Sequence, residues 1–311
     1  LIGSDGMATD ALHAKLFSAD DDSPVLLGQW SRDMGSSTVT MPKQGSDPAN
    51  LGEDEVGRVG YKFTGWTLAQ DGSGRVYNGG DSYQPVANTD FYAQWLANMY
   101  TVKFDGNGAT SGNMNTQTFT YDGGKALLRN GYSRQHDITY TRASEDDPVI
   151  DFTSNVLTKS PFTVDGWAAT PTGDVTYQLE QNVRNLTATD GDEVTLYAHW
   201  TSDGVALPTP AERPGYLFAG WKISGTHEAG GGIAIKEDGT RAIVDDGDLV
   251  GGLTAYTRFA PYANCTLTAQ WKEIEFSVNY WSNGKKLFTT AGDQKVSNFV
   301  ADAQELINKL P

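Results

Sequence analysis

One short segment occurs three times in this chain, and the repetition constrains the fold more than any other feature. It reads FYAQW at Phe91 to Trp95, LYAHW at Leu196 to Trp200 and LTAQW at Leu267 to Trp271. In each copy a large apolar residue, an alanine and a tryptophan alternate with more polar residues, as in a strand with one buried face. We therefore expect three equivalent β-strands from three related modules, with these tryptophans in the cores.

A second motif precedes each copy and ends in Gly-Trp. It reads GYKFTGW at Gly60 to Trp66, FTVDGW at Phe162 to Trp167 and GYLFAGW at Gly215 to Trp221. Glycine directly before tryptophan indicates a β-bulge or a close backbone approach that re-aims the indole. A shorter segment, VLLGQW at Val25 to Trp30, is interpreted as a degenerate copy of the first motif.

The middle module also has an opening, YTVKFDGNG from Tyr100 followed by TQTFTY from Thr116, which predicts a strand, a Gly-rich turn and a strand. Together these motifs resemble the Listeria–Bacteroides repeat family, also called the internalin B-repeat type. Its pattern runs from YTVTFDANGG through QTVTYG, a proline-bearing turn and GYTFTGW to TLYAQW. The resemblance is fullest over residues 57 to 200. It implies compact modules similar to the β-grasp, placed in tandem along exported bacterial surface proteins.

The composition agrees with short strands joined by turns, since the chain has 35 glycines and a hydrophobic share of 38%. We predict a mainly β (α+β) fold of tandem β-grasp-like repeat modules, with antiparallel sheets and few short helices. The predicted segments are 1–30, the remnant of a preceding repeat; 31–98, repeat 1; 99–200, repeat 2 with an insertion; 201–271, repeat 3 with a Gly-rich insertion; and 272–311, a partial repeat 4.

Three departures from the repeat pattern matter. The middle module is interrupted between Tyr132 and Phe162, and the interruption contains a strand-like segment at Ile138 to Arg142. The third module lacks an opening strand pair and inserts glycines at Gly230 to Gly232 before its last strand. In the final segment, a hairpin around Asn283 is followed by an apolar helical stripe from Phe299 to Leu310. A hairpin followed by a helix is the first half of a β-grasp, so we expect the parent protein to continue.

Charge and cysteine content exclude several classes of partner and site. The formal net charge of −16 disfavours binding to nucleic acid or to anionic lipid, because phosphate groups would be repelled. The chain contains no apolar stretch of the ~20 residues that span a bilayer, and its first residues do not read as a signal peptide. Cys265 is the only cysteine, so an intrachain disulfide or a multi-cysteine metal site cannot form.

Catalytic and metal motifs are also missing from the sequence. The acidic loops do not fit the EF-hand spacing and are interpreted as solvated turns. The histidines are scattered, and His199 takes the place of Gln94 and Gln270 on the wetter strand face. We therefore predict no catalytic residue, no cofactor and no metal site. The loops and histidines considered are Asp20–Asp22, Asp105–Ala109, Asp190–Glu193, Asp245–Asp248, His13, His136, His199 and His227.

A covalent crosslink between side chains is a further possibility, because exported bacterial domains can be joined in this way. Cys265 and Gln270 are poor candidates for a thioester, since they have opposite strand parity. Lys103 could donate an isopeptide bond, but the sequence marks neither an acceptor nor a catalytic acid.

The resemblance implies a non-catalytic repeat region of an exported cell-surface protein, acting as a stalk or spacer and as an adhesion module. Its location would be extracellular, with signal and anchor outside this chain, and its partner an unidentified protein or glycan on a surface. An alternative is a carbohydrate-binding module in which exposed aromatic side chains stack on sugar rings; Trp30 and Trp281 are the candidates, because both lie outside the paired motifs. A third is an accessory region of a secreted glycan-active enzyme.

Overall fold

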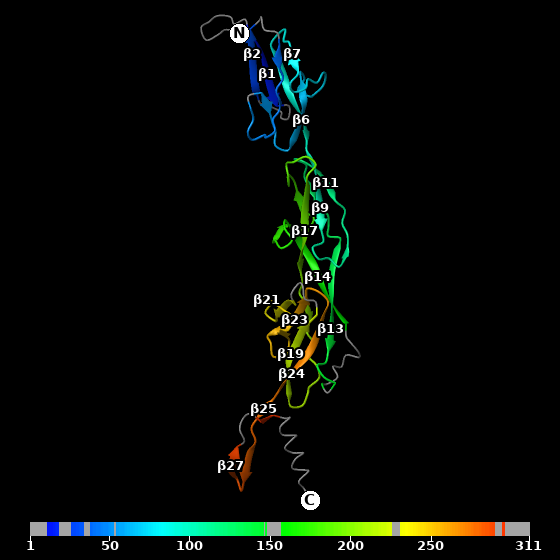
Figure 1. Cartoon of the computed structure of the whole chain (residues 1–311), viewed down its shortest axis with the longest axis vertical. Coiled ribbons are helices and arrows are strands. Elements are labelled where there is room, and N and C mark those ends of the chain that lie inside the picture. Colours follow the sequence, from blue (N-terminus) through cyan, green and yellow to red (C-terminus); the bar gives the residue numbers. More distant parts are fainter. Residues whose placement is uncertain are drawn as a thin grey trace. The chain divides into compact units, whose positions relative to one another are not determined.

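The computed structural model describes residues 11–18, 26–33, 38–52, 54–145, 147, 157–225, 231–289 and 294–295. These residues form strands, turns and loops, and no helix occurs among them (Figure 1). The predicted mainly β fold is confirmed, whereas the few short helices are not found in this part of the chain. The helix predicted at Phe299 to Leu310 lies outside the described residues.

The first sheet has the strand order β2-β1-β8-β6. β1 is antiparallel to β2 and parallel to β8, and β8 is antiparallel to β6. Two short pairs, β3–β7 and β4–β5, complete this module. The strands are β1 (Ala11–Ser18), β2 (Leu26–Asp33), β3 (Val39–Thr40), β4 (Lys43–Gln44), β5 (Glu55–Val56), β6 (Tyr61–Thr67), β7 (Ser82–Tyr83) and β8 (Thr89–Ala97).

The pairing of β1 and β2 changes the interpretation of the first residues. Because β1 lies parallel to β8, this hairpin belongs to the first sheet, although the sequence analysis assigns residues 1–30 to a preceding repeat. Of the segment interpreted as a degenerate closing strand, Leu26 to Trp30 lie in β2, which is the second strand of this opening hairpin. Both kinds of strand show the same two-residue period, so the sequence pattern alone does not separate them.

The largest sheet follows the order β11-β9-β17-β14-β13-β24-β19-β22, with β10 beside β13 and β15 beside β14. Its parallel pairs are β9–β17 and β13–β24. A separate short pair joins β12 to β16. The strands are β9 (Met99–Asp105), β10 (Ser111–Gly112), β11 (Gln117–Thr120), β12 (Lys125–Ala126), β13 (Tyr132–Thr141), β14 (Leu157–Ala168), β15 (Val175–Tyr177), β16 (Asn182–Val183), β17 (Glu193–Thr201), β19 (Tyr216–Ser224), β22 (Leu249–Val250) and β24 (Cys265–Glu273).

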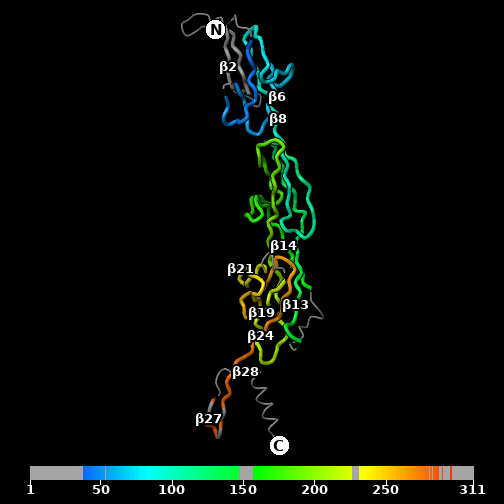
Figure 2. The backbone as a smooth tube through the Cα atoms, in the orientation of Figure 1, coloured from blue at the N-terminus to red at the C-terminus, as the bar shows by residue number. Residues whose placement is uncertain are grey.

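The third module obtains its opening strands from the insertion of the middle module. β13 is parallel to the closing strand β24, with Ile138 opposite Cys265, and it is antiparallel to the first half of β14 (Figure 2). β1 and β9 have the same relation to β8 and β17. As predicted, residues 201–271 begin without an opening strand pair of their own, and the strands that take this place lie far upstream in the chain.

The Gly-rich insertion of the third module supplies three strands of a four-stranded sheet in the order β18-β23-β20-β21, and the fourth strand, β18, precedes the Gly-Trp motif. Downstream, β25 pairs with β28, and β26 pairs with β27 around Asn283 and Gly284, which have φ values of 48° and 76°. That turn confirms the predicted hairpin. The strands are β18 (Val205–Ala206), β20 (Gly232–Lys236), β21 (Arg241–Val244), β23 (Tyr256–Pro261), β25 (Glu275–Phe276), β26 (Asn279–Ser282), β27 (Lys285–Thr289) and β28 (Gln294–Lys295).

The chain divides into two compact units of three segments each. One unit contains residues 1–105, 114–130 and 166–198; the other contains 106–113, 131–165 and 199–311. The segments of the two units alternate along the sequence. The predicted limits of the individual repeats remain predictions, as does the β-grasp detail.

The cores are built around the tryptophans of the Gly-Trp motif. Trp66, Trp167 and Trp221 are fully buried. Trp66 lies in a cluster with Met41 and Phe91, and Trp221 in a cluster with Ile138. Burial of an aromatic side chain of this size dominates the energetics of a small core.

The glycine before each tryptophan makes the predicted close approach. A Cβ at Gly65 would meet the Tyr77 carbonyl oxygen at 3.0 Å, and one at Gly166 would meet the Tyr177 oxygen at 2.9 Å. At Gly65 and Gly220, φ is +133° and +141°, and the strand register shifts immediately before each of them. The predicted bulge is therefore confirmed in β6 and β19.

The closing strands bear out the predicted alternation except at their tryptophans. The apolar residue and the alanine of each copy are buried, for example Phe91 and Ala93. The tryptophans Trp95, Trp200 and Trp271 are only half-buried. The fully enclosed position in each core is already filled by the Gly-Trp tryptophan, so the closing tryptophan packs on its margin.

Candidate functional site

The two tryptophans proposed as sugar-stacking residues lie on strands at opposite ends of the chain. Trp281 is in β26 and is 62% exposed, with Lys286 opposite it on β27. Trp30 is in β2 opposite Ala14, and its side chain lies outside the described residues. An exposed indole can stack on a sugar ring or on a protein surface. The two residues lie in separate sheets and are not paired with each other.

The joint between the first and middle modules is a polar network inside one compact unit. Only Asn98 separates β8 from β9, and its N–H donates to the Gly60 carbonyl at 2.8 Å. Its side-chain amide donates to the Ala188 carbonyl at 2.7 Å. The Tyr61 hydroxyl donates to Asp122 at 2.9 Å, and the Tyr61 ring packs edge-to-face on Tyr121. The two modules are therefore joined by specific hydrogen bonds and a ring contact and not by a flexible linker alone.

The same contacts shift the pKa values of two titratable groups at this joint, Asp122 and Tyr61. The Asn185 amide and the Tyr61 hydroxyl both donate to Asp122, and these bonds lower the pKa of its carboxyl group. Partial burial, followed by the bond to Asp122, raises the pKa of Tyr61. The Arg58 guanidinium lies 3.6 Å from the centre of the Tyr61 ring. Tyr61 thus receives a cation on its face and a carboxylate at its hydroxyl.

Two arginines hold the linker that follows the middle module. Arg241 donates to the Ser202 carbonyl at 2.6 Å, and Arg258 donates to the carbonyls of Asp203 and Gly204 at 2.6 and 2.8 Å. Both arginines come from the small sheet that the Gly-rich insertion forms. The sheet that contains the insertion therefore restrains this linker.

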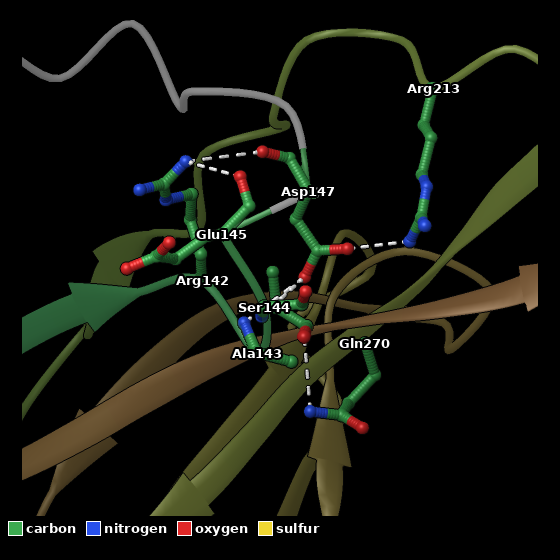
Figure 3. A network of polar contacts seen from close by, with 8 residues as sticks. Arg142, Ala143, Ser144, Glu145, Asp147, Arg213 and Gln270 are labelled. Atoms are coloured by element: carbon green, nitrogen blue, oxygen red, sulfur yellow. Dashed lines mark hydrogen bonds and ion pairs between the residues drawn. The ribbon is translucent and has the colours of Figure 1, made fainter.

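A buried carboxylate anchors the loop after β13 (Figure 3). Asp147 is 4% exposed and accepts hydrogen bonds from the backbone N–H groups of Ala143 and Ser144 at 3.1 and 3.0 Å. Its other oxygen accepts from Arg213 at 2.5 Å. Arg142 donates to the Asp147 carbonyl. The buried Asp147 carboxylate accepts from three donors, so its burial is compensated and it anchors the loop after β13.

The acidic loops serve as hydrogen-bonded turns. Asp190 accepts from the Met99 N–H at 3.0 Å, and Asp192 accepts from the Thr187 hydroxyl at 2.7 Å. Asp248 accepts from the Asp245 N–H at 2.9 Å. Within the described ranges no group of three or more His, Cys, Asp or Glu residues could hold a metal ion. Asp20–Asp22 lie outside those ranges.

Two histidines are described with their side chains. His199 is half-exposed, and its Nδ1 lies 2.6 Å from Asp165. His136 is 9% exposed and accepts a hydrogen bond from Arg134 Nε at 3.2 Å. Burial, and then the positive charge of Arg134, lowers the pKa of His136. The side chain of His13 and residue His227 lie outside the described part of the chain.

The crosslink candidates are not arranged for reaction. Burial, and then Asp246, raises the pKa of the Cys265 thiol to about 12, so the thiolate is scarce at neutral pH. Gln270 donates to the Ala269 carbonyl. Lys103 forms an exposed ion pair with Glu193 at 3.7 Å.

The sequence analysis did not identify the joint residues as functional. The only recurring signal is the Tyr of GYKFTGW, which returns as Tyr216 in GYLFAGW, and polar residues beside a strand such as Asn98 are also typical of ordinary turns. A search of the described residues for a helix able to cross a membrane finds none.

Comparison with known proteins adds a family match over part of the chain. Residues 32–94 match the family model of the Listeria–Bacteroides repeat domain. Among curated proteins, two of Evansella cellulosilytica are similar: a "Putative Gly-rich membrane protein", 28% identical over 54% of this chain, and a "Putative membrane protein", 30% identical over 30% of it. The chain spans about a fifth of the length of these relatives, namely 20% and 17%.

A solved structure titled "Crystal structure of Mub-RV" aligns with 84% of this chain and 100% of its own, at 13% identity. Its TM-score is 0.20, which is too low to support an argument. The family match stands by itself, and it coincides with the module whose GYKFTGW and FYAQW motifs led to the expected resemblance. Over residues 32–94 the chain is therefore similar to the Listeria–Bacteroides repeat domain.

Proposed function

We propose that this chain is a non-catalytic repeat region of an exported bacterial cell-surface protein, in which it acts as a stalk or spacer. The joint at Asn98 carries the proposal. One residue separates two modules, and its backbone and side chain are both hydrogen-bonded. A spacer needs connections that resist bending, and a linker of this length has little freedom to bend. The repeat family and the names of the relatives support a location at the cell envelope.

Small-angle X-ray scattering of the whole chain tests the spacer role. A compact globule of this length would have a radius of gyration of about 20 Å, and a spacer should exceed that value clearly. The matched variant inserts four Gly-Ser residues after Asn98, which should broaden the distribution of distances without unfolding the strands. A radius near that of a globule, or no response to the insertion, would argue against a spacer.

Surface location has its own test. Intact cells that express the parent protein should bind an antibody raised against this chain, and mild external proteolysis should remove the signal. Labelling that requires permeabilised cells would contradict the proposed location.

Adhesion to a glycan is a second candidate function, favoured by the exposure of Trp281. A glycan array should then show saturable binding that is lost in Trp281→Ala or Trp30→Ala and retained in Leu157→Ala, a substitution at another exposed apolar residue. An array without hits would contradict adhesion to a glycan.

A further inference from the structure

The third module contains two strands that the chain supplies long before the rest of that module. Ile138 and Tyr140 of β13 are buried in one cluster with Trp221, Phe259 and Leu267. The first two belong to the insertion of the middle module and lie before residue 211, and the other three lie after it, so residue 211 divides the chain into two parts. All of them lie in the same compact unit.

The backbone contacts between these two parts of the chain are numerous. β13 pairs with β24 from Ile138–Cys265 to Thr141–Thr268, and β18 pairs with β23. The Asp137 N–H donates to the Asn264 side chain at 2.9 Å across 127 residues of sequence. A strand inserted between two partners satisfies its backbone groups on both sides and buries apolar side chains with them.

Side chains add polar contacts between the same two parts. Arg134 donates to the Tyr262 carbonyl, and Arg213 pairs with the buried Asp147. The Trp221 indole donates to the Pro208 carbonyl at 2.8 Å. Each of these contacts joins a residue before 211 to one after it.

The covalent link between the parts is by contrast exposed. Ala211 and Glu212 are both exposed and lie between β18 and β19, outside any strand. Exposed loop positions of this kind are the usual sites of proteolytic nicking. In an array of independent modules, one cut here would release everything downstream.

We propose that the insertion of the middle module is a donated strand pair, which keeps the downstream part of the chain attached after cleavage of the loop around Ala211. The strands β13 and β14 then act as a noncovalent clasp, and a cut in this loop does not shorten the array. This property goes beyond the spacer role and does not require it.

The test places a specific protease site between Ala211 and Glu212 of the whole chain. After complete cleavage, the two fragments should co-elute in native size-exclusion chromatography at the volume of the uncut chain and should separate in denaturant. Separation of the fragments in native buffer overturns the proposal.

A matched pair of substitutions tests whether β13 holds the downstream fragment. Ile138→Asp places a charge in the buried cluster and should release the downstream fragment after cleavage, whereas Ile243→Asp makes the same change at a 74% exposed position and should not. Co-elution that persists in Ile138→Asp overturns the proposal, because attachment would then not depend on the donated strand.

A further measurement uses no substitutions, so its result cannot be explained by a variant that fails to fold. Hydrogen exchange of the peptide covering Cys265 to Trp271 should differ by less than about threefold between cut and uncut chains, since β24 keeps both neighbours. Loss of protection at β24 on cleavage overturns the proposal.

Discussion

The three Gly-Trp tryptophans allow the contribution of one buried hydrogen bond to stability to be measured by comparison within a single chain. The Trp66 indole N–H donates to the Pro42 carbonyl and that of Trp221 to the Pro208 carbonyl, both at 2.8 Å. Trp167 is equally buried, but its Nε1 has no acceptor among the described residues. The middle module has Leu128 where the others have the proline, and the Leu128 N–H is bonded to Gln117. We predict that tryptophan to phenylalanine substitution is more costly at Trp66 and Trp221 than at Trp167.

The magnitude follows from what each substitution leaves behind. All three leave a similar cavity, so that cost cancels in the comparison. Trp66→Phe also leaves the Pro42 carbonyl without its donor, which costs about 1–3 kcal/mol. Trp167→Phe instead removes a buried donor that has no partner, which recovers a similar amount. The free energy of unfolding should therefore fall by at least about 2 kcal/mol more at Trp66 than at Trp167.

Native-state hydrogen exchange measures this difference within each module. Hydrogen exchange of the β6 backbone amides in Trp66→Phe should accelerate about 30-fold more than that of the amides at the end of β14 in Trp167→Phe. This ratio follows because about 1.4 kcal/mol of unfolding free energy corresponds to a tenfold change in the exchange rate. Trp281→Phe, at an exposed indole, should leave both rates within about twofold of the unaltered chain. Equal acceleration at Trp66 and Trp167 would refute the reasoning, since the acceptor carbonyl would then contribute nothing.

Three further predictions concern a glycine, a histidine and an ion pair. Gly65→Ala should lower the unfolding free energy by about 2–4 kcal/mol in urea titrations, because φ is +133° and the Tyr77 carbonyl blocks a Cβ; Gly191→Ala, with open space around it, should cost about 1 kcal/mol. Folding lowers the pKa of His136, so the unfolded chain takes up this proton first. The contribution of His136 to stability should be fully present above about pH 7 and should decline as pH falls below about 6.5. In thermal melts, His136→Gln should therefore reduce the dependence of the melting temperature on pH in this range; an unchanged dependence would exclude His136 as its source. Asp147→Asn should destabilise the chain by about 2–4 kcal/mol because it leaves Arg213 without its charge partner, whereas Arg129→Gln, in an exposed pair, should change stability by less than about 0.5 kcal/mol.

Local sequence patterns indicate the turns of the candidate sites but not the contacts between distant segments. The acidic loops were recognised as turns because Asp and Gly together are typical of turns. The joint around Asn98 and the anchor at Asp147 were not recognised, since each joins residues that are far apart in the sequence. The exposure of Trp281 agrees with its position outside the paired motifs, and its ligand stays a proposal.

The sequence by itself determined the local elements. A two-residue period specified the closing strands, glycine before tryptophan specified the bulges in β6 and β19, and Asn283-Gly284 specified a hairpin turn. Each of these depends on interactions within a few residues, such as the alternation of side chains along a strand or a positive φ that glycine accepts without strain.

Only the tertiary structure decided which strands belong together. Ile138 and Cys265 become neighbours in a parallel pair, and no local pattern distinguishes that partner from any other strand with the same period. It also decided that the tryptophan of each Gly-Trp motif, and not the closing tryptophan, is fully enclosed. Both outcomes depend on how several segments share one core, because burial is a property of the assembled neighbours and not of the strand that carries the side chain.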